Sequence, residues 1–557
     1  MAAVVSWISE SVQEIPQISG LTLQTCLVFF AAFLLTCALL RRPRNLPPYP
    51  AGHVPVLGHL LALGRAPLLK LTAWRRQYGD VFTVRMGMED VVVLNGYTAV
   101  KDALVDRSEL FASRPPNYLF DSSVGFGKGE TFKFSNLFVL FILSNIGAAR
   151  WGTGLKQRRR FATAALKHLG MKVGTGSVED NIRQEASYVR ATLTPSPHPS
   201  LPPSLCLYLC PSTIVDVTGA RPTYNLQIAE YHGQPFAISN DMKVAVANVI
   251  CSMAFGRRYG YEDETFRELS EAIRNLLAEI GSGQFISVFP LLRFVPGVNR
   301  ACKEVLKHLS KIHEVLWDEI ARHRENFDRE NPRDFLDFCL LELEQREKVE
   351  GLTEENVLYM AQNLFLAGTD TTANTLLWSL LYMTLNPDIQ NKVHEELDAV
   401  LGVPALSHRS QLPYVNACLL ETLRIRTILP FAVPHATTKA VRTQGFDIPR
   451  GTQVLPNLYS LHMDPAFWPD PDRFDPGRFL DAEGNLINKP QSFMPFSGGR
   501  RVCLGEQLAR MELFLFFSTL LQSFNFKTPE GAPAPNTDGV LGLTLVPHPF
   551  QLCAMPR

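Results

Sequence analysis

The chain has 557 residues, which is enough for several domains by length alone. Its 54 basic residues balance its 54 acidic ones, so no global charge favours nucleic acid as a partner. Its ten cysteines are scattered without CxxC pairs, which is typical of reduced thiols facing the cytosol and not of a disulfide framework.

An uncharged apolar run covers residues 21–40 and is about 20 residues long, the length of a membrane-spanning helix. Three arginines follow it within residues 41–44, whereas residues 1–20 contain no Lys or Arg. The positive-inside rule then predicts a lumenal segment 1–20, a transmembrane anchor 21–40 and a cytosolic remainder. A cleaved signal peptide is disfavoured because the run is long and lacks a basic leading region. A buried helix of a soluble protein is the remaining alternative.

Residues 41–60 combine this basic stop with a proline-rich hinge, which predicts an extended linker. Residues 78–100 alternate and are rich in Val, which predicts a hairpin of a small sheet. Residues 240–350 have apolar positions at helical steps, with a break near Asn331 and a helix start at Asp334. A long helix is expected over residues 355–385.

Further helices are expected through Glu395 and Glu421. The last hundred residues are rich in Pro, Gly and aromatic residues, which predicts loops and short strands.

Two stretches do not fit this organisation. Residues 131–149 form a short apolar patch, and residues 193–233 are rich in Pro and Ser without periodicity. They are read either as extra loops that contact a membrane, or as retained non-coding sequence or an unusual isoform. The second reading is preferred because long loops without structure are uncommon inside compact domains.

The long helix contains the segment Ala367-Gly-Thr-Asp-Thr-Thr372, whose Gly and Thr residues are poor helix formers. Threonine hydroxyls can bond the carbonyls of the preceding turn and distort the helix locally. Asp370 and Thr371 would then offer an acid and an alcohol at one point. Taken alone, a solvated kink explains this segment equally well.

The most informative motif is Phe496-Ser-Gly-Gly-Arg-Arg-Val-Cys503-Leu-Gly505, which precedes an apolar helical run. A cysteine at a helix start is expected to have a lowered thiol pKa and to favour the thiolate that binds metals. Gly498 and Gly499 would let the backbone approach a flat partner closely. The alternative is a buried structural cysteine.

The spacing F-x-x-G-x-R-x-C-x-G resembles the haem-binding loop of the cytochrome P-450 family. The runs ENPRDFLD, AGTDTTANTLLWSLLYMTLNP and GGRRVCLGEQLARMELFLFF look most like vertebrate family-two members near the U and J subfamilies. The resemblance covers nearly everything outside the two atypical stretches. It implies a mainly α fold with small β-sheets, formed by one haem-thiolate monooxygenase domain over residues 61–557 behind a single N-terminal transmembrane helix.

The resemblance also implies roles for individual residues. Cys503 would be the axial ligand of the iron of heme b, and Asp370 and Thr371 would manage protons for oxygen activation. The remaining residues implied to bind the cofactor are Arg114, Arg159, His435, Phe496, Arg501 and Gly505, of which the three arginines and the histidine would hold the haem propionates. One departure is Leu155, which stands where the family has Trp, while Trp151 lies one turn earlier.

A structural role is implied for Glu421, Arg424 and Arg478, which match the family's E-x-x-R pair and its downstream P-x-R-F arginine. A surface ion pair of little worth is the alternative for Glu421 and Arg424. The candidate substrate pocket consists of apolar residues, although Leu or Phe at helical spacing is more often plain core. Besides Thr371, its members are Phe120, Leu366, Ala367, Leu429, Val433 and Leu541.

The family resemblance implies a membrane-anchored monooxygenase of the endoplasmic reticulum that inserts one oxygen atom from O2 into lipophilic substrates such as fatty acids, xenobiotics or sterol-like compounds. Electrons would come from NADPH through a separate flavoprotein, NADPH–cytochrome P-450 reductase, and sometimes cytochrome b5. The chain shows no G-x-G-x-x-G fingerprint at a strand–helix junction, so it is not expected to bind NADPH itself. A basic face for the acidic donor would comprise Lys156, Arg158, Arg160, Lys167 and Arg500.

Two alternatives stay open at this point. A haem-thiolate isomerase or dehydratase of lipid hydroperoxides would need neither O2 nor a reductase, and the acid–alcohol pair argues against it. A non-catalytic haem-binding membrane protein would be the outcome if the atypical stretches and Leu155 abolish turnover.

Overall fold

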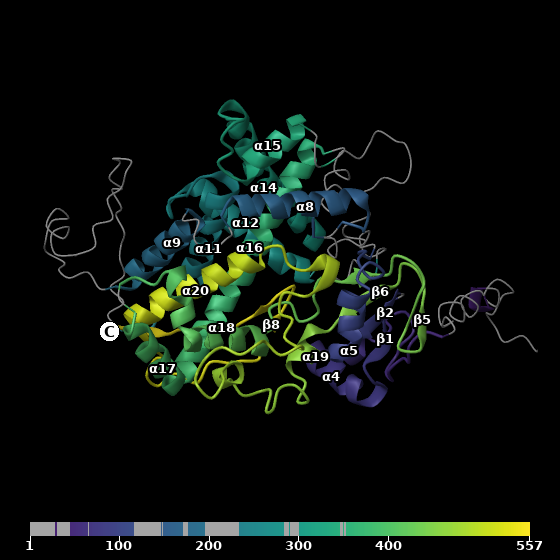
Figure 1. Ribbon diagram of the computed structural model, residues 1–557. Coiled ribbons are helices and arrows are strands. Elements are labelled where there is room, and N and C mark those ends of the chain that lie inside the picture. Colours follow the sequence, from purple (N-terminus) through teal and green to yellow (C-terminus); the bar gives the residue numbers. More distant parts are fainter. Residues whose placement is uncertain are drawn as a thin grey trace, which may run out of the picture.

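A computed structural model describes residues 28–30, 45–64, 66–87, 89–115, 146–147, 149–170, 177–194, 233–282, 289, 300–345, 349, 352–400 and 402–557. The described chain is mainly helical with small sheets, as expected (Figure 1). Most of the expected anchor and of the two atypical stretches lies outside these residues. Within the described part, no helix combines the length and the apolar character needed to cross a membrane.

The helices of the first half are α3 (Leu60–Leu63), α4 (Pro67–Tyr78), α5 (Gly96–Lys101), the π-helical turn η1 (Asp102–Asp106), α8 (Thr153–His168), α9 (Ser177–Leu193), α11 (Ser239–Phe255) and α12 (Glu264–Ser282). Those of the second half are α14 (Arg300–Glu325), α15 (Phe335–Gln345), α16 (Glu354–Leu385), α17 (Pro387–Asp398), α18 (Pro413–Ile425), α19 (Leu458–His462) and α20 (Glu506–Ser523), with 3-10 turns η3 (Leu406–Gln411), η4 (Pro476–Phe479) and η5 (Gly499–Arg501).

The largest sheet has four strands in the order β1-β2-β6-β3, formed by β1 (Val81–Met86), β2 (Glu89–Leu94), β6 (Gln453–Pro456) and β3 (His435–Ala436). The hairpin predicted over residues 78–100 is confirmed, since β1 and β2 pair antiparallel with Val81 opposite Leu94. Strand β6 runs parallel to β2. The smaller sheets pair β4 (Val441–Thr443) with β5 (Phe446–Ile448), β7 (Phe524–Lys527) with β10 (Cys553–Pro556), and β8 (Val540–Leu541) with β9 (Leu545–Val546).

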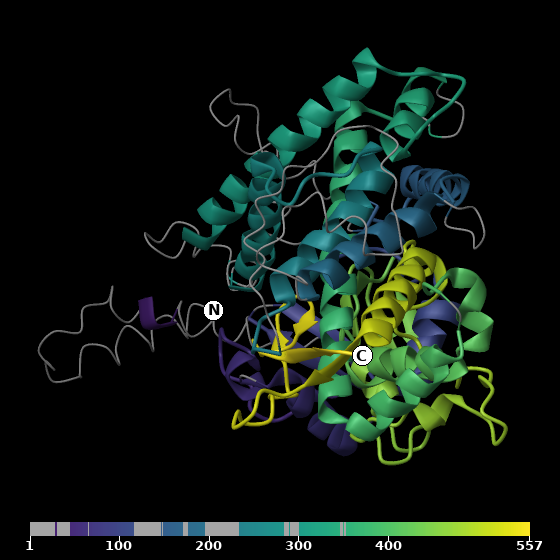
Figure 2. The same cartoon turned by 90° about the vertical axis from the view of Figure 1, so that its left-hand side faces the viewer.

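The helices predicted within residues 240–350 are present as α11, α12, α14 and α15. Asp334 lies at the predicted helix start, where its carboxylate accepts a hydrogen bond of 3.0 Å from the backbone N–H of Asp337. This contact satisfies one of the free N–H groups at the beginning of α15. Figures 1 and 2 both place α14 and α15 at the end of the molecule away from the β1–β2 hairpin.

Helix α16 forms the centre of the helical part and contacts α11, α14, α18 and α20. It begins with a capping box, in which the Thr353 hydroxyl accepts a hydrogen bond from the Asn356 N–H. At Gly368 a Cβ atom would lie 2.5 Å from Cδ1 of Ile250, so glycine lets α11 pack closely against this turn.

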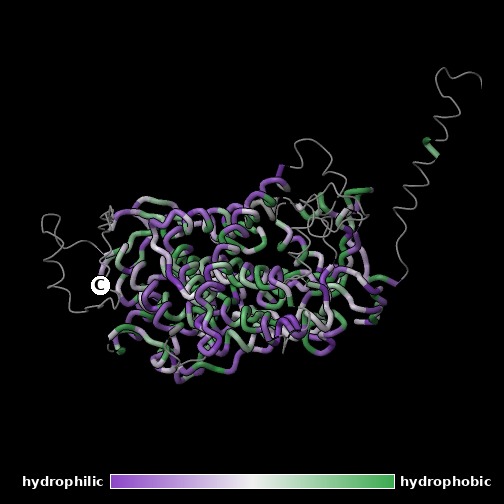
Figure 3. Tube along the Cα trace, turned by 90° about the horizontal axis from the view of Figure 1, so that it is seen from above, coloured by the Kyte–Doolittle hydropathy of each residue, from purple (hydrophilic) through white to green (hydrophobic). Residues whose placement is uncertain are grey.

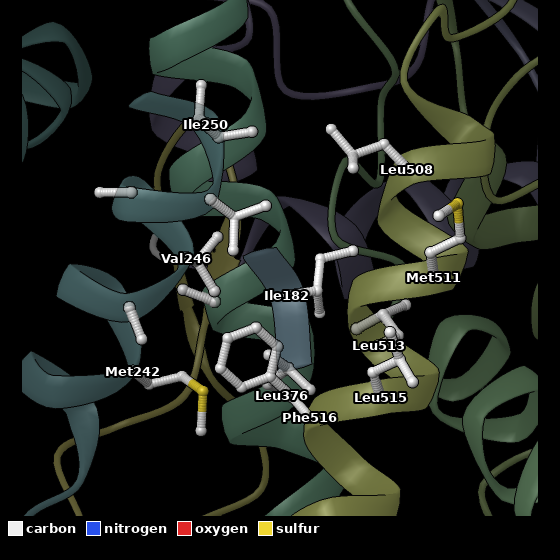
Figure 4. Close-up of a cluster of buried hydrophobic side chains, with 14 of the residues drawn as sticks. Ile182, Met242, Val246, Ile250, Leu376, Leu508, Met511, Leu513, Leu515 and Phe516 are labelled. Carbon is white, nitrogen blue, oxygen red and sulfur yellow. The ribbon is translucent and has the colours of Figure 1, made fainter. Parts of the chain in front are cut away.

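Figure 4 shows the apolar layer beside this crossing, where Val246 and Ile250 of α11 and Leu376 of α16 face Leu508 and Phe516 of α20. Burial of side chains in such a layer is the dominant favourable term in folding. Figure 3 shows hydrophilic and hydrophobic residues following one another along the same trace, as expected where each helix has one buried face. The layer therefore sets the position of α16 relative to α20, the helix that follows Cys503.

Candidate functional site

Cys503 stands between the turn η5 and helix α20, as its motif predicts. Its backbone N–H donates a 3.1 Å hydrogen bond to the carbonyl of Phe496, which closes the loop that contains both residues. The Cys503 side chain is exposed, in contrast to the neighbouring Arg501, which is buried. The loop thus holds a reachable thiol at the start of a buried helix.

The expected lowering of the Cys503 pKa is wrong for the polypeptide alone. Although the side chain is exposed, the protein atoms around the sulfur desolvate it and raise the pKa of this thiol, and a hydrogen bond from the Gly505 backbone and the charge of Arg159 offset only part of that rise. Proximity to a helix start is therefore insufficient to hold a thiolate here. A bound metal cation deprotonates a coordinating thiol outright and would supply the missing stabilisation.

The expected use of Gly498 and Gly499 also needs correction. Gly499 has φ +66°, and a Cβ there would lie 1.6 Å from the carbonyl oxygen of Leu104 in η1. A Cβ at Gly498 would lie 2.8 Å from Cε of Met494 and 3.0 Å from Val105. The space that a side chain would take at both glycines is therefore filled by protein atoms and not by a flat partner. At Gly505, by contrast, a Cβ would meet no protein atom within 4 Å.

Three segments far apart in the sequence bring basic side chains together beside this loop. Arg501 donates through Nε to the Ala112 carbonyl at 2.7 Å, and Arg114 donates through Nη1 to the Val433 carbonyl at 2.9 Å. Arg501 and Arg114 also share the carbonyl of Gly147 as an acceptor. Arg159 of α8 reaches the Val502 carbonyl at 2.7 Å, one residue before Cys503. The fourth member, His435, is buried in β3.

The electrostatics of this basic cluster (Arg114, Arg159, His435 and Arg501) are unusual because no carboxylate among the described residues compensates its charge. Burial, followed by the charges of Arg501 and Arg159, holds the pKa of Arg114 well below its usual range. Burial and Arg159 lower the pKa of Arg501 to about 9. In the described part of the chain, no Asp or Glu forms an ion pair with any of the three arginines.

His435 completes the same pattern. Its Nδ1 donates a 2.7 Å hydrogen bond to the Phe111 carbonyl, which leaves Nε2 for another partner. Burial, together with the charges of Arg114 and Arg501, keeps the pKa of His435 well below its usual value. Buried charges are normally paired, so a cluster of this kind calls for an anionic ligand. A thiol beside a buried cationic cluster is the donor set that fits a haem, whose iron takes the sulfur and whose propionates take the cations.

The departure at Leu155 can now be placed. Leu155 is buried in α8 and contributes to the core. Trp151 lies just before α8, and its ring centroid is 5.6 Å from the guanidinium carbon of Arg501 and 5.0 Å from Nζ of Lys156. An aromatic residue therefore does contact the basic cluster, from a position one turn earlier than the family pattern.

The AGTDTT segment lies in α16, and its threonines bond backwards as expected. The hydroxyls of Thr369 and Thr371, and of Thr375 just after the segment, donate to the carbonyls four residues earlier, with Thr371 Oγ1 at 2.6 Å from Ala367 O. The helix nevertheless runs without a break from Glu354 to Leu385. The hydroxyls therefore bond to the preceding turn within a continuous helix.

Asp370 engages partners that the sequence did not indicate. Its Oδ2 accepts a 2.8 Å hydrogen bond from Thr544, and its Oδ1 lies 3.7 Å from Nζ of Lys243 in α11. Thr371, its neighbour, bonds instead to the backbone of its own helix. The acid and the alcohol thus lie next to each other in the chain but have different contacts. No sequence pattern marks Lys243 or Thr544, because each is an ordinary residue of its own segment.

The residues of the expected structural network are in contact and buried. Arg424 donates through Nε and Nη2 to the two carboxylate oxygens of Glu421, both at 2.7 Å, and both side chains have an exposed fraction of 0%. Nε of Arg478 lies 3.4 Å from the same carboxylate. Glu421 also accepts the backbone N–H of Asp475 at 2.9 Å. The pair is therefore no surface ion pair.

The candidate pocket residues come from four segments. Ala367 is the one exposed residue of α16, although it lies in the middle of that helix. Val433 is 38% exposed, and Leu366, Leu429 and Leu541 are partly buried against the main core. Phe120 lies outside the described residues.

The expected basic face is partly neutralised. Lys156 Nζ lies 3.1 Å from the Glu109 carboxylate, and Arg500 Nη2 lies 3.7 Å from the same oxygen. These contacts place α8 and the Cys503 loop side by side at the surface. Arg160 and Lys167 are exposed on α8 as well.

Two buried residues were not singled out from the sequence. Glu512 of α20 is buried, which raises its pKa to about 8 despite a hydrogen bond with Thr372. His462, at the end of α19, is buried and accepts the backbone N–H of Met494 at 2.9 Å. Both lie in segments rich in apolar residues, where the spacing of those apolar residues predicts the core but does not single out a buried Glu or His.

Comparison with known proteins gives the same picture as the geometry. The sequence model of the family described as Cytochrome P450 matches residues 47–196 and 226–554, and the unmatched gap lies within the atypical stretch 193–233. Cytochrome P450 2U1 of Homo sapiens is 36% identical over 551 residues, which cover 93% of this chain and 90% of the relative.

Two further relatives have the same level of identity. Cytochrome P450 2D4 of Rattus norvegicus is 36% identical and covers 97% of this chain and 99% of the relative. Vitamin D(3) 25-hydroxylase of Sus scrofa is 36% identical and covers 94% of this chain and 96% of the relative. The chain therefore belongs to the cytochrome P450 family, as a family-two member, and is an oxidoreductase of the monooxygenase type.

Proposed function

We propose that this protein is a membrane-anchored haem-thiolate monooxygenase of the endoplasmic reticulum. It would act on lipophilic substrates with electrons from NADPH, delivered by a separate flavoprotein reductase. The single observation that carries the proposal is the buried basic cluster, for which the described residues offer no carboxylate, placed directly beside the reachable thiol of Cys503.

The cofactor would be heme b. Cys503 supplies the sulfur ligand, and Phe496 and Gly505 belong to the loop that positions it. Charge-assisted hydrogen bonds to the propionates would come from Arg114, Arg159 and Arg501. Nε2 of His435 is bare in the neutral ring and would donate to a propionate only after that anion raises the pKa of His435 and the ring takes a second proton. When bound, the haem supplies the activation of O2 and the transfer of one oxygen atom to the substrate.

The chain's own contribution to proton delivery would come from α16. The hydroxyl of Thr371 can exchange its bond to the Ala367 carbonyl for a water molecule without breaking the helix. Asp370 is held by Thr544 and Lys243, and the Lys243 side chain is 26% exposed. These contacts offer a route by which the Asp370 carboxylate regains protons from solvent.

The substrate would be apolar and of moderate size. Its pocket would be formed by Phe120, Leu366, Ala367, Thr371, Leu429, Val433 and Leu541. All of these except Thr371 are apolar, which suits burial of a hydrocarbon surface. The relative named Vitamin D(3) 25-hydroxylase supports keeping sterol-like compounds among the candidates, beside fatty acids and xenobiotics.

The reductase, or in some cases cytochrome b5, would dock on the basic residues of α8 and the Cys503 loop. Lys156, Arg160, Lys167 and Arg500 are exposed there. An acidic donor protein would be steered to this face and would arrive next to the ligand-bearing loop. Residues 21–40 would hold the domain at the cytosolic side of the membrane as a single span.

The test is a pair of cysteine variants. Cys503→Ala should abolish the absorbance that reduced haem-thiolate protein shows with carbon monoxide, because no other sulfur replaces the ligand. Cys553→Ala removes another free cysteine and should leave the spectrum unchanged. An unchanged spectrum in Cys503→Ala would refute the assignment. Reductase-reconstituted protein, offered fatty acids, sterols and drug-like compounds in parallel, should then convert at least one class in an NADPH-dependent reaction.

A further inference from the structure

His462 stands out among the buried titratable residues because both of its ring nitrogens have defined partners. Its exposed fraction is 0%. Nε2 lies 2.9 Å from the backbone nitrogen of Met494, and Nδ1 lies 2.6 Å from Oγ1 of Thr427. The Thr427 hydroxyl in turn lies 3.1 Å from the carbonyl of Arg424. The imidazole therefore bridges the end of α18 and the segment before Cys503.

These contacts determine the protonation state of the ring. The N–H of Met494 can only donate, so Nε2 must be the bare acceptor nitrogen. The proton of the neutral ring then sits on Nδ1 and is donated to Thr427, whose own hydroxyl donates to the Arg424 carbonyl. A second proton on Nε2 would point at the Met494 N–H and remove that hydrogen bond. Burial and the charge of Arg424 lower the pKa of His462 to about 3, in agreement with a neutral ring.

His462 also has contacts that tie it to the buried ion pair. Its carbonyl accepts a 2.7 Å hydrogen bond from Nη1 of Arg424, the residue whose other nitrogens hold Glu421. Its ring centroid lies 5.6 Å from that of Phe493, the residue before Met494. Backbone and ring thus connect the Glu421–Arg424 pair to residues 493 and 494.

Met494 begins the loop that ends at Cys503. Its carbonyl accepts the Ser497 N–H at 3.0 Å, and the Phe496 carbonyl accepts the Cys503 N–H at 3.1 Å. The backbone N–H of Met494 is therefore one point at which the first turn of this hydrogen-bonded loop is attached to the interior. Its acceptor is a side chain, and a substitution at residue 462 can remove it without changing the loop itself.

We infer that His462 is a positioning residue for the sulfur ligand: it attaches the first turn of the Cys503 loop to the buried Glu421–Arg424 pair by offering a bare ring nitrogen to the Met494 N–H. The effect on the sulfur ligand rests on the proposed haem-thiolate function, whereas the hydrogen bond between His462 and Met494 concerns the polypeptide alone. A side chain that keeps the acceptor keeps the loop in place, and an isosteric ring that lacks it does not.

Three substitutions test this at residue 462. His462→Phe keeps an aromatic ring against Phe493 but removes both nitrogens, His462→Gln carries an amide oxygen that can replace Nε2, and His462→Asn reaches only the position of Nδ1. His313→Phe is the matched control, because His313 is also buried and bonds to Gln362 at 2.8 Å in the helical part, away from the loop.

The first readout is amide hydrogen exchange at Met494. Loss of one hydrogen bond should speed exchange there by about tenfold in His462→Phe and His462→Asn, and His462→Gln should restore slow exchange. The second readout is the fraction of reduced, carbon-monoxide-bound protein with the thiolate spectrum. It should fall in the same two variants and stay at the wild-type level in His462→Gln and His313→Phe.

Slow exchange at Met494 in His462→Phe would overturn the inference, and so would equal loss of the thiolate spectrum in His313→Phe. If His462→Phe does not fold, the comparison of His462→Gln with His462→Asn decides the question in the same way. A wild-type protein that binds no haem would defeat the proposed function alone, because the exchange measurement at Met494 still reports on the attachment.

Discussion

Substitution of Glu421 by Gln should destabilise the protein far more than the same change at an exposed ion pair. Glu421→Gln preserves the shape of the side chain but removes the charge that faces Arg424, which is completely buried. Removing one partner of a buried ion pair typically costs about 3–5 kcal/mol, because the other charge remains in the interior. Two observations decide where in this range the effect falls.

Arg424 keeps the carbonyls of His462 and Pro471 as acceptors, and the amide oxygen of Gln can still accept a hydrogen bond. Burial raises the pKa of Glu421 even though Arg424 opposes that rise, so desolvation offsets part of the attraction within the pair. Both effects place the cost at the lower end, about 3 kcal/mol.

The corresponding change in melting temperature follows from the size of the chain. An unfolding entropy of about 2.1 cal/mol/K per residue amounts to about 1.2 kcal/mol/K for 557 residues. A loss of about 3 kcal/mol then lowers the apparent melting temperature by about 2–3 °C at a fixed scan rate.

The control is Glu344→Gln, which breaks another Arg–Glu pair with two short contacts, to Arg329. That pair is exposed, and solvent already screens it, so the melting temperature of the Glu344→Gln variant should stay at the wild-type value. Equal shifts in the two variants would show that burial of the Glu421–Arg424 pair does not govern its contribution, and the reasoning would fail.

Three other predictions concern the loop, the proton route and pH. Gly499→Ala should prevent formation of haem-loaded protein, because its Cβ would overlap the Leu104 carbonyl at a φ of +66°. The control Gly152→Ala adds a Cβ that meets nothing within 4 Å, so this variant should load haem normally as judged by absorbance. Asp370→Asn should keep the Thr544 contact and the haem spectrum but lower coupled turnover by roughly tenfold or more. Thr371→Ala should divert electrons from product to peroxide. Tightly coupled product formation in these variants, measured against NADPH consumption, would argue against both proton roles. Burial lowers the pKa of His323, but the hydrogen bond and charge of Asp334 outweigh burial, so the net pKa is raised. The pair therefore contributes stability below about pH 6.5, and this contribution is lost as the pH rises through the raised pKa. The apparent melting temperature should decrease from pH 6 to pH 8 by more in the wild type than in His323→Gln.

Local motifs could be read from the sequence because their geometry depends on neighbouring residues. The Cys503 loop, the hairpin of β1 and β2 and the helix start at Asp334 are all of this kind, and the structure contains each of them. The contacts of Asp370 could not be read in this way. Its partner Thr544 is 174 residues away, and only the packing of the C-terminal strands beside α16 brings the two together.

The two physical expectations that failed share one cause. Helix position predicts a lowered pKa for Cys503, and glycine predicts room for a flat partner, but both arguments treat the loop as though only the ligand surrounds it. In the folded chain, burial raises the thiol pKa, and η1 fills the space next to Gly499. Tertiary packing thus reversed an argument that is correct for an isolated segment.

The equal totals of acidic and basic residues also give no sign of the buried basic cluster, which is the feature that best indicates the cofactor. Arg424 is compensated by Glu421, whereas among the described residues Arg114 and Arg501 have backbone carbonyls alone as acceptors. Carbonyl dipoles satisfy the N–H groups but leave the net charge in place, and this is why burial holds the pKa of Arg114 well below its usual range. A chain that holds these arginines ready in this way has already met the cost of desolvating them. An anionic ligand that binds there gains the attraction without that cost, so the buried positive charge favours tight retention of a doubly negative cofactor over any neutral one.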